Sequence, residues 1–383
     1  MVSYNPQGAS YFTGGSRYNQ TYPVVIDFTT GVLDPRIDLQ RTAAANYFTS
    51  GGLIASAGAN VPRFDYSPDG ATYRGLQIEA AATNEAIWCR DLTQSTWVKS
   101  NITAALNQTG LTGVASSASS LTATSGNGTC LQTITSTSST RFVSAYVKRL
   151  VGSGNIDMTL DNGSTWTTVT VTAGWTRVYT SQASVTNPVC GFRIVTSGDS
   201  IAVDYVQEEK TRLTSPVENG GAQAGRVADR CLLKGMHFNE FWNPFEGTVY
   251  LEYMHPVALS GTTIYVASIN NGTTTDTFNL FADAGASNTR LVITTGNVSQ
   301  CSIGPVTTTA LAVVKIAFSY KLNAANISIN GAATLNDASV GLPQTMTQID
   351  FGRLAGGGQS AIWLRKFKYW NTEMVSSLPT LST

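Results

Sequence analysis

Short runs of β-forming residues recur from residue 141 to the end of the chain, and Gly, Asn, Asp or Ser separates each run from the next. In residues 247–254 (GTVYLEYM), Val249, Leu251 and Tyr253 alternate with the remaining side chains. Because successive side chains of a strand point to opposite faces, such a run buries one face and leaves the other wet. This pattern predicts antiparallel sheets packed face to face.

The runs fall into two blocks on either side of residues 208–230, where alternation stops and Pro216 and several glycines occur. Asn330-Gly331 in the second block predicts a tight turn between antiparallel strands, since both residues tolerate positive φ. We therefore predict a mainly β protein with two consecutive antiparallel β-sandwiches of the jelly-roll type, at residues 92–210 and 246–383, joined by a connector at residues 211–245. The expected strands are residues 141–149, 156–160, 165–171, 175–179, 189–195, 201–206, 247–254, 263–268, 277–282, 290–295, 310–320, 325–329, 348–353 and 361–369.

Residues 1–91 differ from the rest, because they hold many aromatic residues and turn signals but few clean alternations. They predict an irregular N-terminal region that packs against another surface. Within this region, the Ala and Glu residues of 77–89 favour a helix.

Charge and residue inventory exclude several classes of protein. The chain has 24 Lys+Arg against 24 Asp+Glu, and only 13% of its residues are charged, so no uniform field attracts nucleic acid. No apolar run is long enough to span a membrane, and the first residues lack the pattern of a secretory signal. We expect no cofactor, no nucleic-acid partner and no membrane insertion.

Metal and nucleophile chemistry have few candidate residues. The five cysteines lack paired spacing, which predicts free, buried thiols. With two histidines, the chain has few of the usual ligands of zinc or copper and few candidates for a general base, and nothing in it resembles a Ser-His-Asp triad. We therefore assign no metal site. A calcium site built from oxygen ligands is the one metal site that the sequence does not exclude.

Hydrolysis of a glycan needs two carboxylates facing each other across the sugar. Glu246 and Glu252 flank one expected strand, and Glu208 and Glu209 close another. The chain lacks the Glu-x-Asp-x-x-Glu strand of lectin-fold glycosidases. We interpret these groups as surface carboxylates at strand ends and assign no catalytic residue.

Sugar binding combines an aromatic face with amide, carboxylate or guanidinium groups. Trp242 lies in the connector and is a candidate for an exposed ring. The alternative, which the usual burial of large aromatic residues favours, is that Trp242 and its aromatic neighbours cap the sandwich core. Asn270, Asn271 and Asp283 lie in polar hairpin loops that could meet a glycan or a calcium ion, and turn chemistry alone also explains them. These four residues are the candidate glycan site.

Several short motifs follow one another near the N-terminus: residues 33–37 (LDPRI), 60–66 (NVPRFDY), 74–79 (RGLQIE) and 83–84 (TN). Together they resemble a module found near the N-terminus of many tailed-bacteriophage tail and fibre proteins, with the signature NVPRFDY…RGLLIEEARTN. Ala82 stands where that signature has Arg.

Two further resemblances are at the level of the fold. Residues 174–178 (GWTRV), 214–216 (TSP) and 226–229 (RVAD) occur in an order similar to a carbohydrate-binding-module jelly roll followed by its connector in phage proteins. Residues 246–374 resemble concanavalin A-like or laminin-G-like sandwiches. Lectin-like folds often serve only as structure.

The resemblances imply a non-enzymatic structural virion protein of a tailed bacteriophage, from the tail tip, a fibre or a decoration. Residues 1–91 would attach it to other virion proteins or to sister subunits of a homotrimer, and the sandwiches would bind bacterial surface polysaccharide. The protein would be assembled in the host cytoplasm and reside in the virion. Two alternatives remain: a purely architectural virion protein without a glycan ligand, and a polysaccharide depolymerase on a lectin-like fold.

Overall fold

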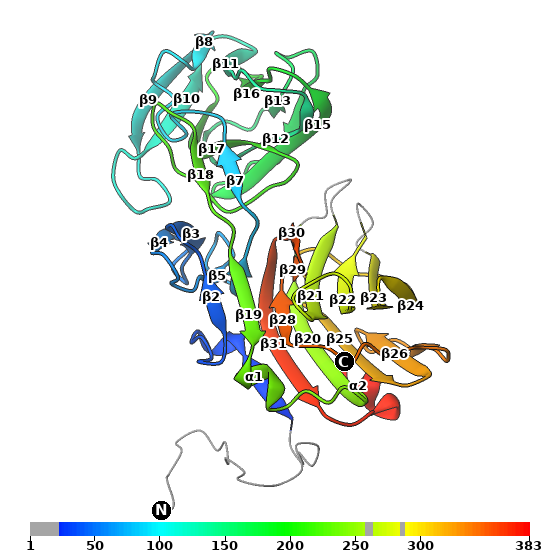
Figure 1. Cartoon of the computed structure of the whole chain (residues 1–383). Helices are drawn as coiled ribbons and strands as arrows, with labels where there is room; N and C mark the ends of the chain where they lie inside the picture. The colour runs from blue at the N-terminus through cyan, green and yellow to red at the C-terminus, as the bar shows by residue number, and fades with distance from the viewer. Residues whose placement is uncertain (1–22, 257–262, 284–287) are drawn as a thin grey trace, which may run out of the picture.

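The computed structural model describes residues 23–256, 263–283 and 288–383. Its elements are almost all β-strands, which form two sandwiches arranged one above the other in Figure 1. The predicted mainly β fold with two antiparallel sandwiches is therefore confirmed. No helix in the described part of the chain is long and apolar enough to cross a membrane.

The upper sandwich is a jelly roll. In one sheet the strands are ordered β15-β12-β17-β10-β9, and in the other β14-β13-β16-β11-β8. From β10 onward this order is that of two interlocked Greek keys, with β9 and β8 added at the edges. The strands are β8 (Val98–Ser100), β9 (Ile102–Gln108), β10 (Ala118–Ala123), β11 (Gly128–Thr133), β12 (Ser139–Val151), β13 (Ile156–Thr159), β14 (Thr167–Val169), β15 (Thr176–Val185), β16 (Val189–Ile194) and β17 (Ser200–Lys210).

The lower sandwich is larger. One of its sheets has the order β27-β26-β25-β20-β31-β6-β5, with β1 also paired to β31, and the other has the order β2-β19-β28-β21-β22-β23-β24. The strands are β1 (Val24–Asp27), β2 (Asp38–Gln40), β5 (Phe64–Tyr66), β6 (Tyr73–Ile78), β19 (Arg230–Lys234), β20 (Glu246–Met254), β21 (Ile264–Asn270), β22 (Thr277–Ala282), β23 (Asn288–Thr295), β24 (Val298–Thr307), β25 (Val314–Lys321), β26 (Ala324–Ile329), β27 (Leu335–Asp337), β28 (Gln348–Phe351) and β31 (Ile362–Trp370).

Strand pairing corrects the predicted domain limits. In β1, Val24 pairs with Tyr369, and in β2, Leu39 pairs with Cys231, so both ends of the chain build one sandwich. From Val24 on, the N-terminal region is therefore not a separate irregular segment, because β1 and β6 pair with β31 and β2 pairs with β19. The connector predicted at residues 211–245 likewise contains β19 of the same sandwich. Residues 1–22 of the predicted attachment region lie outside the described residues.

The jelly roll is thus inserted into the lower sandwich. The chain leaves the lower sandwich after β6 and returns to it at β19. The outgoing segment contains β7 (Ala82–Asn84) and the returning segment contains β18 (Ala224–Arg226), and these two short strands pair with each other. Figure 1 shows this ribbon between the two sandwiches. The expected helix at 77–89 is wrong, because β6 ends at Ile78 and β7 follows, with an extended backbone that links two domains.

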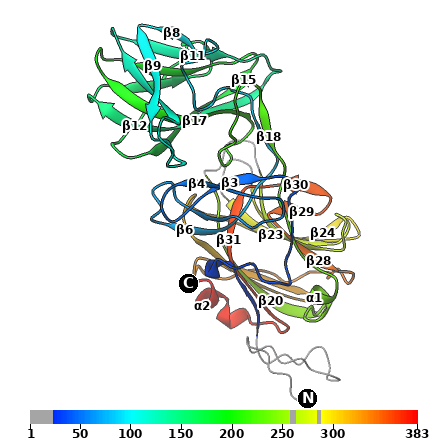
Figure 2. The ribbon, with the colours of Figure 1, turned by 90° about the vertical axis from the view of Figure 1, so that its left-hand side faces the viewer.

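A hairpin of β3 (Ala45–Phe48) and β4 (Ile54–Ala57) lies between the sandwiches, as Figure 2 shows. Phe48 and Ile54 pack against Tyr146 and Tyr205 on the outer face of a jelly-roll sheet. This apolar cluster joins the two domains.

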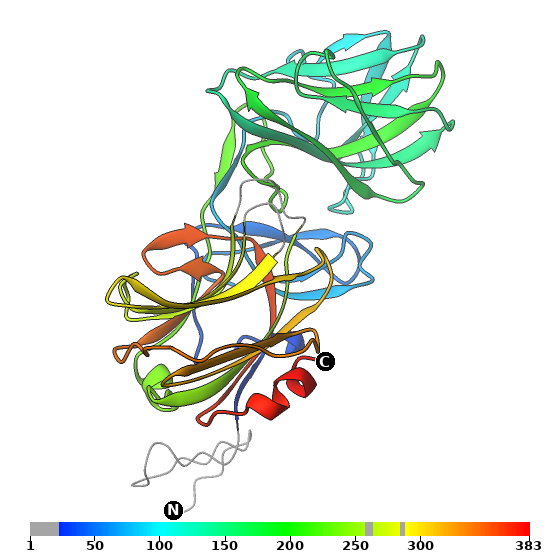
Figure 3. The ribbon, with the colours of Figure 1, turned by 90° about the vertical axis from the view of Figure 1, so that its right-hand side faces the viewer.

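Minor elements complete the fold. They are η1 (Phe28–Thr30), α1 (Met236–Asn239), η2 (Val375–Ser377), α2 (Leu378–Leu381), and a small ribbon of β29 (Arg353–Leu354) and β30 (Gly357–Gln359). In Figure 3 the C-terminal helix α2 lies beneath the lower sandwich, where Leu378 packs on Tyr250 and Ala317.

Two local predictions are confirmed. Asn330 and Gly331 have φ of 50° and 73°, and the turn they make joins β26 to the antiparallel β27. The five cysteines are free and buried. Burial raises the pKa of the Cys89 thiol to about 12, so this group stays protonated and unreactive.

Candidate functional site

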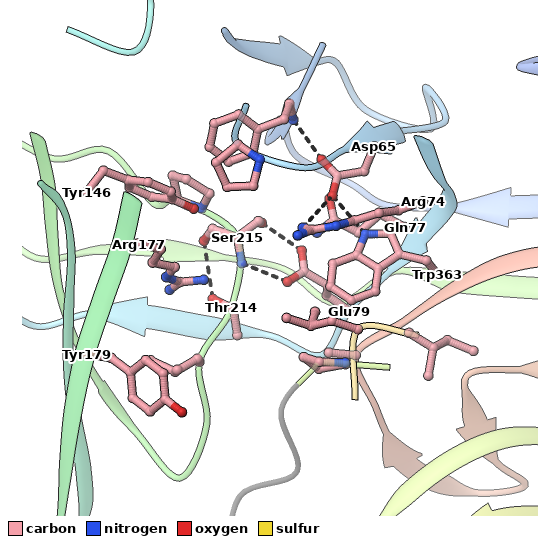
Figure 4. Close-up of a pocket in the computed structure, with 18 residues that line it drawn as sticks. Asp65, Arg74, Gln77, Glu79, Tyr146, Arg177, Tyr179, Thr214, Ser215 and Trp363 are labelled. Atoms are coloured by element: carbon pink, nitrogen blue, oxygen red, sulfur yellow. Dashed lines mark hydrogen bonds and ion pairs between the residues drawn. The ribbon is translucent and has the colours of Figure 1, made fainter. Parts of the chain in front are cut away.

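A cavity of about 170 Å³ lies where the two sandwiches meet. Side chains of the jelly roll form one wall and side chains of the lower sandwich form the other, while the returning chain supplies residues between them (Figure 4). The polar and aromatic lining residues are Asp65, Arg74, Gln77, Glu79, Tyr146, Arg177, Tyr179, Thr214, Ser215 and Trp363.

The jelly-roll wall follows from strand alternation. In β12, Val143, Ala145 and Val147 point into the jelly-roll core, so Tyr146 points out of it. Tyr146 pairs with Arg177 across the antiparallel strand β15, and Tyr179 lies two residues further on the same face. Tyr179 is 37% exposed, which leaves part of its ring open at the cavity.

The opposite wall is centred on Trp363 in β31. Trp363 pairs with Gln77 of β6, while their neighbours Ile78 and Leu364 enter the core of the lower sandwich. The guanidinium carbon of Arg74 lies 4.7 Å from the centre of the Trp363 ring, in a cation–π contact. An aromatic ring and a cation therefore line the cavity together.

Asp65 holds this wall in place. Its carboxylate accepts hydrogen bonds from the backbone N–H of Phe48 (2.7 Å) and from Nε1 of Trp363 (2.8 Å), and it lies 3.6 Å from Nη1 of Arg74. Burial raises the pKa of Asp65 to about 6, although Arg74 and both donors favour the charged form.

A buried ionic network forms the floor. Glu79 pairs with Arg63 at 2.7 Å and with Arg226 at 2.9 Å, and it accepts hydrogen bonds from the backbone N–H (2.7 Å) and the hydroxyl (2.6 Å) of Ser215. Burial alone would raise the pKa of Glu79, but the two arginines and Ser215 outweigh it and hold that pKa at about 2. Glu79 is therefore a fully engaged carboxylate.

The network extends across the domain crossing. Asp229, just before β19, pairs with Arg63 at 2.5 Å and with Arg41 at 2.9 Å, and its carboxylate also accepts the backbone N–H of Glu79. The members come from N-terminal segments that flank β2, β5 and β6 and from the returning chain, so the floor ties the start of the jelly-roll insertion to its end.

The four residues predicted as a glycan site are not brought together. Trp242 is 8% exposed and lies between Phe238 and Tyr320, with ring centres 5.3 and 5.1 Å away. The assignment of Trp242 to ligand binding is therefore corrected: the connector folds its ring into the core, as the capping alternative stated.

The three polar residues predicted in hairpin loops each have partners within the protein. Asn270 is fully buried and donates to the carboxylate of Asp350 (2.9 Å), so it cannot reach a glycan. Asn271 accepts the N–H of Thr273 in a local turn. Asp283 pairs with Arg290 at the opposite end of β22 from the two asparagines. The rest of the Asp283 loop lies outside the described residues.

The interpretation of the glutamates as surface carboxylates is also corrected in part. Glu208 and Glu209 are buried; Arg141 pairs with Glu208 at 3.3 Å, and Thr214 donates its hydroxyl to Glu209 at 2.6 Å. Glu252 pairs with Arg365 at 2.7 Å. Within the described residues, no group of three or more His, Cys, Asp or Glu side chains could hold a metal ion.

Sequence reasoning missed the cavity residues. Arg74 was part of a recognised stretch, but nothing in that stretch indicates that its side chain lies on Trp363. Arg177 and Tyr179 lie in β15, and their outward direction was visible in the alternation with Val178. Only the second wall, from residues far along the chain, makes this face part of a cavity.

No protein-family model and no curated protein matches the sequence. Solved structures similar to part of the chain include the CBM40 of the Ruminococcus gnavus IT-sialidase bound to α2,3 sialyllactose, with 15% identity, a TM-score of 0.31, and coverage of 36% of this chain and 82% of that one. The botulinum neurotoxin serotype C1 binding domain has 11% identity and a TM-score of 0.29, and the match covers 38% of this chain and 38% of that one. A heptameric SAP-like pentraxin from Limulus polyphemus has 13% identity and a TM-score of 0.24, and the match covers 36% of this chain and 68% of that one. At these scores the likenesses assign neither a family nor a ligand.

Proposed function

We propose that this chain is a non-enzymatic structural protein of a tailed-bacteriophage particle that binds a bacterial surface glycan in the cavity between its sandwiches. The observation that carries the binding proposal is the lining of the cavity. Rings of Tyr146, Tyr179 and Trp363 occur there beside the guanidinium groups of Arg74 and Arg177.

This combination fits the chemistry of sugars. The C–H face of a sugar ring packs on an aromatic face, and its hydroxyls need donors and acceptors placed around that face. Trp363 and Tyr179 supply rings from opposite walls, and Gln77 adds an amide. Weak sites of this kind gain strength when several copies act together, as a trimer on a particle would provide.

The acidic groups favour binding over hydrolysis. A glycosidase needs one carboxylic acid that can protonate the leaving oxygen and a second carboxylate that faces the sugar. In Asp65, one oxygen accepts the N–H of Phe48 and the other accepts Nε1 of Trp363, while Glu79 is saturated by arginines and Ser215. Both groups therefore serve to hold the cavity.

The particle assignment rests on the sequence resemblance, and the floor network supports treating the separate stretches as one unit. Arg63 lies in the NVPRFDY stretch, Glu79 in RGLQIE and Asp229 in RVAD, and these three side chains form a continuous chain of ion pairs. Immuno-electron microscopy of virions and light scattering of the purified chain test this part of the proposal. Labelled particles and a trimer are expected; unlabelled particles together with a monomer contradict it.

The binding part is tested with the purified full chain and a panel of bacterial capsular and lipopolysaccharide glycans. We expect saturable binding to members of the panel without formation of new reducing ends. New reducing ends would instead identify a depolymerase. A panel without any binding would favour the purely architectural alternative.

A further inference from the structure

Two arginines that line the cavity have hydrogen-bond donors without a partner among the described residues. The side chain of Arg74 is 15% exposed and lies over the Trp363 ring. It contacts Asp65 only at 3.6 Å, and within the described part of the chain its guanidinium donates no hydrogen bond. Its donors are therefore available to a molecule in the cavity.

Arg177 presents a similar group from the jelly-roll wall. Its Nη2 donates to the hydroxyl of Ser144 at 3.0 Å and lies 4.0 Å from a carboxylate oxygen of Glu209. Among the described residues, its Nη1 has no hydrogen-bond partner, and the side chain is 23% exposed. Both arginines line the same cavity, and Figure 4 shows them on opposite sides of it.

Other arginines of the same domains are satisfied differently. Arg193, on the outer face of the jelly roll, donates Nε and Nη2 to Asp157 at 2.9 and 2.7 Å and stacks on Trp166. Arg63 in the floor is completely buried between two carboxylates. A guanidinium keeps its charge under all ordinary conditions, so the two open arginines carry positive charge into the cavity from both walls.

We propose that the cavity selects a glycan that bears an anionic substituent, a carboxylate or a phosphate, held between Arg74 and Arg177. This inference rests on the proposed glycan binding and adds the class of sugar. Guanidinium groups donate paired hydrogen bonds in the geometry that carboxylate and phosphate oxygens accept. With a neutral sugar in the cavity, the guanidinium donors of Arg74 and Arg177 would bind water instead of an anionic group.

The two arginines also belong to different sandwiches. Arg74 comes from β6 and Arg177 from β15, so one anionic group that contacts both would bridge the domains. The aromatic rings beside them, Trp363 and Tyr179, would then contact the sugar that carries the charge.

The test is an array of bacterial oligosaccharides printed in matched pairs. Each uronic-acid member is paired with its carboxyl-reduced alcohol, and each phosphorylated member with its dephosphorylated form. With the full chain, we expect the charged member of a bound pair to bind about tenfold or more tightly than its neutral partner. The two sets of pairs show whether the anion is a carboxylate or a phosphate.

Arg177→Gln should remove most of this preference, whereas Arg193→Gln, a matched change on the outer face, should keep it. If Arg177→Gln does not fold, the wild-type pairs and their salt dependence still decide, because an ionic contact weakens as salt rises. Equal or weaker binding of the charged members overturns the inference and leaves glycan binding standing. If no member of any pair binds, charged or neutral, both the anionic preference and the proposed glycan binding are overturned.

Discussion

The floor and the walls of the cavity use the same residue type for different purposes. In the floor, Arg63 is fully buried and each of its pairings, with Glu79 and Asp229, is shorter than 3 Å. In the walls, Arg74 and Arg177 keep part of their surface and hold their acidic neighbours at 3.6 and 4.0 Å. The difference suggests two roles for arginine in this cavity. The buried, closely paired Arg63 stabilises the crossing between the domains, whereas the loosely paired Arg74 and Arg177 keep donors that, in our proposal, bind a ligand.

Breaking the floor should have the largest effect. Glu79→Gln leaves Arg63 and Arg226 buried without the carboxylate that they share, and loss of one partner of a buried ion pair costs about 3–5 kcal/mol. We expect a loss of that size in the free energy of unfolding of the full chain, measured by denaturant titration. The control is Asp283→Asn, which breaks the partly exposed pair with Arg290 and should cost no more than about 1 kcal/mol. Equal losses would show that the floor is not special.

A pH titration compares the two carboxylates directly. The pKa of Asp65 is raised from 3.8 to about 6, so its contribution is fully present below pH 3.8 and is lost as pH rises through 6. A shift of this size corresponds to about 3 kcal/mol. The pKa of Glu79 is lowered from 4.5 to about 2, so its contribution is present above pH 4.5 and is lost as pH falls toward 2.

Asp65→Asn isolates the first of these effects. The variant should lose the fall in unfolding free energy between about pH 4 and 6 while keeping the fall below pH 4.5, whatever its stability at neutral pH. The groups around the carboxylate, Arg74, Trp363 and the N–H of Phe48, remain. Parallel pH curves for the variant and the wild type would contradict the raised pKa.

The smallest effect concerns the walls. Tyr179→Ala removes an exposed ring that supports no core, and an aromatic contact of this kind contributes about 0.5–1.5 kcal/mol. We expect glycan affinity to fall about three- to tenfold, measured by calorimetry, with thermal stability unchanged. Trp166→Ala, which removes a half-buried ring on the outer face, is the matched control and should leave affinity unchanged. A larger loss for Trp166→Ala would place the site on that face.

Much of the fold could be predicted because its signals are local. Alternation in residues 247–254 identified β20, and Asn330-Gly331 identified a turn. The N-terminal strands escaped prediction because they are short and because several of them pair with strands far along the chain. Val24 pairs with Tyr369, and nothing within four residues of Val24 specifies a partner so far along the chain.

The candidate site shows the same division. The sequence alone determined the β class, the buried thiols and the outward direction of side chains such as Tyr179. The direction of a strand side chain depends only on its position in a two-residue alternation, which neighbouring residues show. The tertiary structure decided that Trp242 is core and that Asp65 and Trp363, 298 residues apart, share a wall. The cavity depends on where the inserted jelly roll docks on the sandwich, and that position results from contacts between distant segments rather than from any one of them.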